Sequence, residues 1–156
     1  MLPIRTILHP TDFSERSNDA YRLACALARD YNARLLIVHV VPPVAAAVGD
    51  LVWTGPVDYQ EVKDKLLGLE GPDPARVERW LEEGDPASEI LRLAREGRCD
   101  LIVMGTHGRR GLGRLLMGSV AETVLRKAPC PVVTVKAPLP EPGPVQSVPV
   151  PEKVEA

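Results

Sequence analysis

The sequence lacks the features that mark membrane-spanning, secreted and zinc-binding proteins. No apolar run approaches the roughly 18 residues that cross a bilayer, and no basic segment followed by an apolar one opens the chain. Its three cysteines, Cys25, Cys99 and Cys130, are odd in number and lack C-x-x-C spacing, so neither a disulfide framework nor a zinc site is expected. We therefore expect a soluble, cytoplasmic protein with buried thiols and no contact with a membrane.

An excess of charge is also missing. The formal net charge is −2, which argues against a general nucleic-acid binder and favours a small-molecule ligand. The three histidines, His9, His39 and His107, are scattered along the chain, so no metal site is expected. Of these, His107 lies in a glycine-rich stretch, where it either touches a bound phosphate or faces solvent.

Proline, by contrast, is concentrated at the end of the chain. Residues 137–156 contain six prolines, Pro138, Pro140, Pro142, Pro144, Pro149 and Pro151, which prevent a regular helix or a central strand. The 156 residues suit one hydrophobic core. We expect one domain over residues 1–136 and an extended accessory tail over residues 137–156.

Apolar runs alternate with helical stripes through the expected domain. Strands are predicted at residues 4–9, 34–41, 76–83, 100–104 and 131–136. Helices are predicted after Ser14, within residues 57–69, from the Asp85-Pro86 cap to Gly97, and from about Gly118 to Ala128. The charges of residues 76–83 suit a sheet edge, and residues 42–56 are expected to be a long loop. The alternation predicts an open parallel sheet with helices on both faces.

The stretch from residue 104 to residue 122, MGTHGRRGLGRLLMGSVAE, lies between a predicted strand and a predicted helix. It holds five glycines, Gly105, Gly108, Gly111, Gly113 and Gly118, and three arginines, Arg109, Arg110 and Arg114. Glycines let a backbone approach a ligand closely, and a helix start attracts anions. The stretch therefore predicts a phosphate site, with one of the arginines touching phosphate. The alternatives are a surface loop that binds nothing and arginines that form only a solvated face.

Three features of this stretch refine the prediction. Ser119 and Glu122 stand three residues apart, as in a capping box, which would place the helix start at residues 118–120. A Walker A loop is excluded because Gly118 is followed by Ser119 rather than lysine. The Rossmann glycine spacing is absent as well.

Three motifs carry a resemblance to a known family. They are Pro10-Thr11-Asp12-Phe13-Ser14, the spacing Gly105-x2-Gly108-x9-Gly118-Ser119, and APCPVVTV at residues 128–135. Over residues 4–136 the sequence resembles the ATP-binding branch of the universal stress protein family. The resemblance implies the strand order 3-2-1-4-5, in which strands one and four form a switch point where ligands bind.

The same resemblance implies a set of nucleotide-binding residues. They are Pro10, Thr11, Asp12, Val40, Met104, Gly105, His107, Gly108, Arg109, Gly118, Ser119 and Val120. The glycines, Ser119 and Val120 would surround the phosphates, residues 10–12 would lie near the ribose, and Val40 would offer its backbone to adenine. Two alternatives remain open: that Asp12 caps a turn instead, and that Met104 belongs to the core.

The expected function is that of an ATP-binding stress-response regulatory protein, in which nucleotide occupancy alters shape or partner choice. Mg²⁺ would be held mainly by the phosphates. The alternatives are a nucleotide-free interaction module of the same fold and a slow ATPase or nucleotidyl transferase. No residue is assigned as catalytic or as a metal ligand, because Asp12, His107 and Ser119 are far apart in the sequence. A homodimer through the apolar edge strand Val132 to Val135 is expected, as is a regulatory protein partner of unknown identity.

Overall fold

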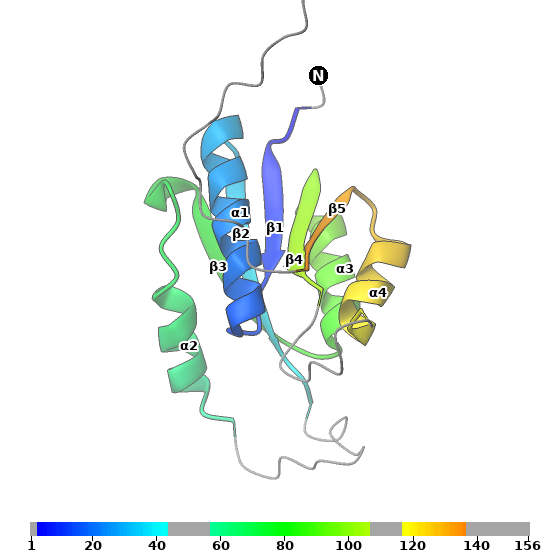
Figure 1. Ribbon diagram of the computed structural model, residues 1–156. Coiled ribbons are helices and arrows are strands. Elements are labelled where there is room, and N and C mark those ends of the chain that lie inside the picture. Colours follow the sequence, from blue (N-terminus) through cyan, green and yellow to red (C-terminus); the bar gives the residue numbers. More distant parts are fainter. Residues whose placement is uncertain (1–2, 44–56, 107–116, 137–156) are drawn as a thin grey trace, which may run out of the picture.

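The computed structural model describes residues 3–43, 57–106 and 117–136. Its strands are β1 (Thr6–Pro10), β2 (Arg34–Val41), β3 (Val77–Glu83), β4 (Leu101–Gly105) and β5 (Val132–Val135). Its α-helices are α1 (Glu15–Tyr31), α2 (Tyr59–Leu67), α3 (Pro86–Glu96) and α4 (Ser119–Lys127), and a short 3-10 helix (Pro74–Arg76) precedes β3. The predicted alternation of strands and helices is confirmed (Figure 1). The tail at 137–156 and all but the first two residues of the loop predicted at 42–56 lie outside the described residues.

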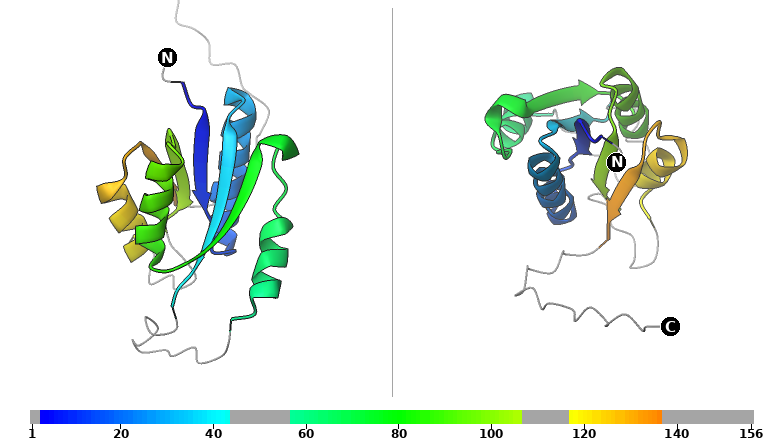
Figure 2. Two further views of the ribbon diagram at one scale, coloured as in Figure 1. Left: turned by 180° about the vertical axis from the view of Figure 1, so that it is seen from behind. Right: turned by 90° about the horizontal axis from the view of Figure 1, so that it is seen from above.

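The described strands form one parallel sheet in the order β3-β2-β1-β4-β5. This is the order that the resemblance implied, and it places β3 and β5 at the two edges. Helices α1 and α2 cover one face, and α3 and α4 cover the other (Figure 2). In the part of the chain that the structure describes, no helix combines the length and the apolar character needed to cross a membrane.

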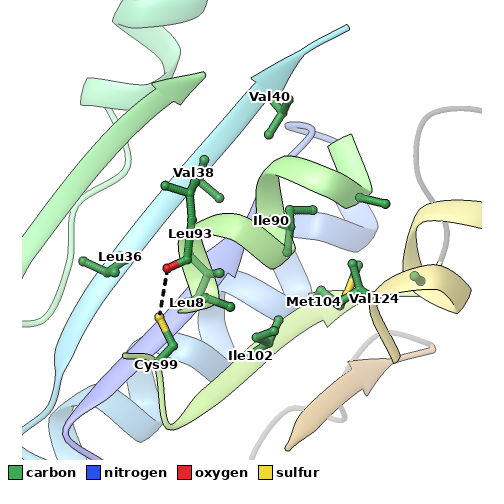
Figure 3. Packing of buried hydrophobic residues seen from close by; sticks show 13 residues of the cluster. Leu8, Leu36, Val38, Val40, Ile90, Leu93, Cys99, Ile102, Met104 and Val124 are labelled. Atoms are coloured by element: carbon green, nitrogen blue, oxygen red, sulfur yellow. Dashed lines mark hydrogen bonds between the residues drawn. The ribbon is translucent and has the colours of Figure 1, made fainter. Parts of the chain in front are cut away.

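Alternate side chains of the central strands pack into two separate clusters, one on each face of the sheet. Leu8 and Ile102 belong to the cluster under α3 and α4, which Figure 3 shows from close by. Ile7 and Val103 belong to the cluster under α1. Burial of each such side chain stabilises the fold by roughly 1.5 to 3 kcal/mol. Because helices cover both faces of the sheet, the side chains on both sides of a central strand are apolar. Cys99 lies in the first cluster, whereas the other two cysteines are only half-buried.

Side-chain caps determine where three of the helices begin. The Ser14 side chain accepts a hydrogen bond from the amide of Ser17 and caps α1, as predicted. Asp85 caps α3 with Pro86 as its first residue, again as predicted. Asp58 caps α2 and Gly68 ends it, so the helix lies within the predicted range 57–69 but is shorter. These caps fix the first residues of α1, α2 and α3.

Candidate functional site

The predicted site lies where β1 and β4 end in the middle of the sheet. β1 pairs with β2 as far as Pro10 opposite Val38, but it pairs with β4 only through Ile7 and Leu8. From β1 the chain enters α1 on one face, and after β4 it reaches α4 on the other (Figure 1). The two predicted segments therefore lie side by side at a topological switch point, where open α/β sheets bind ligands.

The turn between β1 and α1 is held by the Thr11 side chain. Thr11 is buried, and its amide donates to the Val38 carbonyl at 2.8 Å. Its Oγ1 accepts from the Phe13 amide at 3.1 Å and from the Ser17 hydroxyl at 2.9 Å. These bonds hold Phe13 at a φ of 62°, a left-handed conformation that costs a non-glycine residue roughly 1 to 2 kcal/mol. The Phe13 ring in turn packs on His39, with ring centroids 4.6 Å apart.

Asp12 organises the same turn. Its Oδ1 accepts from the Ser14 amide at 3.0 Å and from the Ser14 hydroxyl at 2.6 Å. The turn-capping alternative for Asp12 is therefore observed in the structure. A bond from Asp12 to a ribose hydroxyl stays a prediction.

On the β4 side, residues Gly105, Thr106 and Gly118 form a closely packed junction. A Cβ added at Gly105 would lie 3.3 Å from the carbonyl oxygen of Arg16 on α1, so glycine has a packing reason at this position. The amide of the buried Thr106 donates to the Val135 carbonyl at 3.1 Å, and its own carbonyl accepts from the Gly118 amide at 2.7 Å. The end of β4 is thereby fastened to the start of α4.

The start of α4 differs from the prediction. Gly118, not Ser119, is the N-cap residue, and among the described residues no side chain caps the helix. The predicted capping box is therefore wrong, because Ser119 is already the first helical residue and the Glu122 amide bonds to the Gly118 carbonyl at 2.9 Å. The helix start itself falls within the predicted residues 118–120. In the described ranges, the amides of Ser119, Val120 and Ala121 have no acceptor, and they lie at the positive end of the helix.

Val40 and Met104 occupy different kinds of position. The Val38 carbonyl points toward β1, where it accepts from the Thr11 amide, and the Val41 carbonyl points toward β3, where it accepts from the Gly84 amide. Because backbone direction alternates along a strand, Val40 presents its N–H and C=O on the β1 side, where β1 pairing has already ended at Pro10. Met104 is only 5% exposed and packs in the cluster under α3 and α4, so its alternative role in the core is observed (Figure 3).

Two histidines that the sequence left without a role lie at the site. The fully buried His9 has its Nδ1 2.9 Å from the Val103 carbonyl oxygen of β4. His39 has its Nδ1 2.8 Å from the Thr11 carbonyl oxygen. Burial lowers the pKa of His9 from 6.5 to about 4, although the bond to Val103 and the Asp12 carboxylate both oppose the shift. His9 is therefore neutral at neutral pH. The sequence signal that could have identified it is its position at a strand end, directly before proline.

The remaining predicted residues, His107, Gly108 and Arg109, lie outside the described residues. Within the described ranges, no three His, Cys, Asp or Glu side chains gather in an arrangement that could hold a metal ion. Two hollows lie elsewhere, beside α1. One of about 110 Å³ lies between Asn32 and Val77, and an open groove of about 390 Å³ runs between Tyr21 and Pro72. Neither contains a predicted site residue.

Comparison with known proteins gives a consistent result. The model of the universal stress protein family matches residues 3–136. A universal stress protein of Methanocaldococcus jannaschii is 36% identical over 148 residues, covering 86% of this chain and 83% of that protein. The crystal structure of a universal stress protein family member from Burkholderia pseudomallei is 33% identical with a TM-score of 0.64, covering 86% of this chain and 97% of the other. A universal stress protein crystallised in complex with cAMP is 27% identical with a TM-score of 0.60, covering 85% and 97%.

Proposed function

The chain belongs to the universal stress protein family, and from this premise we propose that it binds ATP at the β1–β4 switch point and acts as a cytoplasmic stress-response regulator. Mg²⁺ would be carried by the phosphates. The observation that supports the proposal most strongly is the uncapped start of α4. Side chains cap α1, α2 and α3, whereas α4 begins at Gly118 without a side-chain cap from the part of the chain that the structure describes.

A phosphate group is the natural complement to this helix start. The amides of Ser119, Val120 and Ala121 have no acceptor among the described residues and lie at the positive end of the helix dipole. An anion there gains roughly 0.3 to 1 kcal/mol from the dipole, and up to about 2 kcal/mol when partly buried. Gly118 adds no side chain between the first turn and an approaching phosphate.

The other end of the nucleotide fits the opposite side of the switch point. Val40 presents backbone donor and acceptor groups beyond the last pair of β1 and β2, which suits the edge of an adenine ring. Asp12 lies between Val40 and α4 in the sheet order, at the carboxyl end of β1, where a ribose would sit. The related protein that was crystallised with cAMP holds an adenine nucleotide, which supports this class of ligand.

A regulatory role follows from what the ligand would touch. The Thr106–Gly118 bond fastens β4 to α4, and the Thr106 amide also bonds to Val135 at the end of β5. A nucleotide on the first turn of α4 would therefore act on the edge strand β5. We propose that two copies pair through this edge, so that occupancy alters the surface shown to a further protein partner.

A second candidate is a nucleotide-free interaction module of the same fold, and specific contacts favour it. Oδ1 of Asp12 is engaged by Ser14, the Gly118 amide is engaged by Thr106, and the glycine at 105 is explained by packing against α1. None of these contacts requires a ligand. Binding measurements must therefore decide between the two candidates.

The deciding experiment is titration calorimetry of nucleotide-stripped protein with ATP, in the presence and absence of Mg²⁺. Gly118→Val should abolish binding by placing a side chain at the phosphate position, while leaving the fold intact, because Gly118 has a φ of −63° and a ψ of 149° that valine readily adopts. Gly68→Val is the matched control, since it places the same residue at an exposed helix end outside the site.

Three results would change the conclusion. No heat with wild-type protein at millimolar ATP would favour the nucleotide-free module. Equal affinity in wild type and Gly118→Val would place the ATP site elsewhere. Turnover within the usual enzyme range of roughly 1 to 1000 per second would replace the regulatory proposal with an enzyme.

A further inference from the structure

The central strands β1 and β4 separate early, although each keeps its other partner. Their pairing covers Ile7 with Leu101 and Leu8 with Ile102. β1 continues to pair with β2 through Pro10, and β4 continues to pair with β5 through Gly105. The separation is therefore a local feature of the switch point and not a general fraying of the sheet.

The chemistry of residues 9 and 10 explains why the separation occurs there. Proline has no N–H, so Pro10 cannot donate a further ladder hydrogen bond. Val103, on the facing strand, is fully buried, and its carbonyl needs a donor. His9 supplies that donor from its side chain, with Nδ1 2.9 Å from the Val103 oxygen. The imidazole thus replaces a backbone bond with a longer side-chain link.

This arrangement has an energetic cost. His9 Nε2 is buried and has no hydrogen-bond partner among the described residues. An unsatisfied buried acceptor is unfavourable, and an apolar side chain would avoid it. The bond from Nδ1 to Val103 is therefore the interaction for which an imidazole suits this position.

We propose that His9 is a positioning residue that sets the spacing between the two halves of the nucleotide site. On its own strand it is followed by Pro10, Thr11 and Asp12, and across its hydrogen bond Val103 is followed by Met104 and Gly105. A change at His9 shifts both halves relative to each other without touching the ligand. The proposal rests on the nucleotide-binding function above, and its test includes a measurement that needs no nucleotide.

The test compares His9→Asn with His9→Leu. Asparagine retains an N–H near the position of Nδ1, whereas leucine fills the space without a donor. We expect His9→Leu to weaken ATP binding, by at most the roughly tenfold that corresponds to the lost His9–Val103 hydrogen bond. His9→Asn should stay close to wild type. In nucleotide-free protein, hydrogen exchange at the amides of Thr11 and Thr106 should accelerate in His9→Leu and recover in His9→Asn.

Asp100→Ala is the matched control. The Asp100 carboxylate accepts the amides of Arg5 and Thr6 and so links the same two strands at their far end. Its loss should lower stability but leave ATP affinity and exchange at Thr11 and Thr106 unchanged. Unaltered affinity and exchange in His9→Leu would overturn the positioning role, as would an asparagine variant that is as impaired as leucine. If wild-type protein binds no nucleotide, the proposed function fails, and the exchange pattern alone decides the role of His9.

Discussion

Acidification from pH 7 to pH 5 should destabilise the protein, because the buried His9 cannot take up a proton in the folded state as an exposed histidine can. The groups facing its ring are the Val103 carbonyl on β4, the Asp12 carboxylate in the turn and the Tyr21 ring on α1, with ring centroids 5.7 Å apart. Burial outweighs the first two and lowers the pKa to about 4. The unfolded chain therefore binds a proton near pH 6.5, whereas the folded chain resists it until about pH 4.

The sign and size of the effect follow from these two pKa values. The contribution of His9 to stability is complete above pH 6.5 and declines as the pH falls toward 4, because only the unfolded state gains the proton in that window. The full difference corresponds to about 3 kcal/mol, of which about 2 kcal/mol should be lost between pH 7 and pH 5. That loss is large against a typical total stability of roughly 5 to 15 kcal/mol.

Urea unfolding at a series of pH values measures this loss directly. His9→Asn removes the titrating group and keeps a donor for Val103, so its stability should fall less steeply between pH 7 and pH 5. Carboxylates titrate in both proteins, and the difference between the two curves therefore isolates His9. Parallel curves for the two proteins would refute the reasoning.

Three further predictions concern the turn and the sheet edge. Ser14→Ala should lower the free energy of unfolding by about 1 kcal/mol through loss of the cap on the Ser17 amide, measured by urea unfolding, and an unchanged midpoint would contradict the cap. Asp12→Ala should weaken ATP binding by roughly 1 to 3 kcal/mol in calorimetry if the Asp12 carboxylate accepts hydrogen bonds from ribose hydroxyls. A loss of stability without a loss of ATP affinity would leave only the turn-capping role of Asp12. The Val135 carbonyl points toward β4, so the N–H of its neighbour Thr134 points toward the open edge of the sheet. Thr134→Pro removes this N–H and should convert a dimer to a monomer in light scattering, whereas Thr134→Val should not. A mass unaffected by proline would rule out pairing through β5.

The features that the sequence predicted well depend on local patterns. The apolar run at residues 34–41 became β2 with the same bounds, and Asp85-Pro86 began α3 as expected. Both follow from interactions within a few residues. The strand order was implied by the family resemblance and is confirmed by the sheet.

The features that it missed depend on contacts between distant residues. Ser119 and Glu122 match the capping pattern, but the Gly118 amide bonds to Thr106 and Gly118 takes the cap position instead. His9 meets Val103 across 94 residues, and no local periodicity encodes that contact. The nucleotide roles of the predicted residues likewise remain predictions, since a ligand's contacts are set by the assembled site.

The Thr106–Gly118 hydrogen bond has a consequence for how such a domain can change. It joins Thr106, just before the segment 107–116, to Gly118, which follows it, by a direct backbone bond. Closing a longer segment across a fixed junction costs little, about 0.6 kcal/mol for each doubling of length. The scaffold can therefore accept segments of other lengths and compositions at this place.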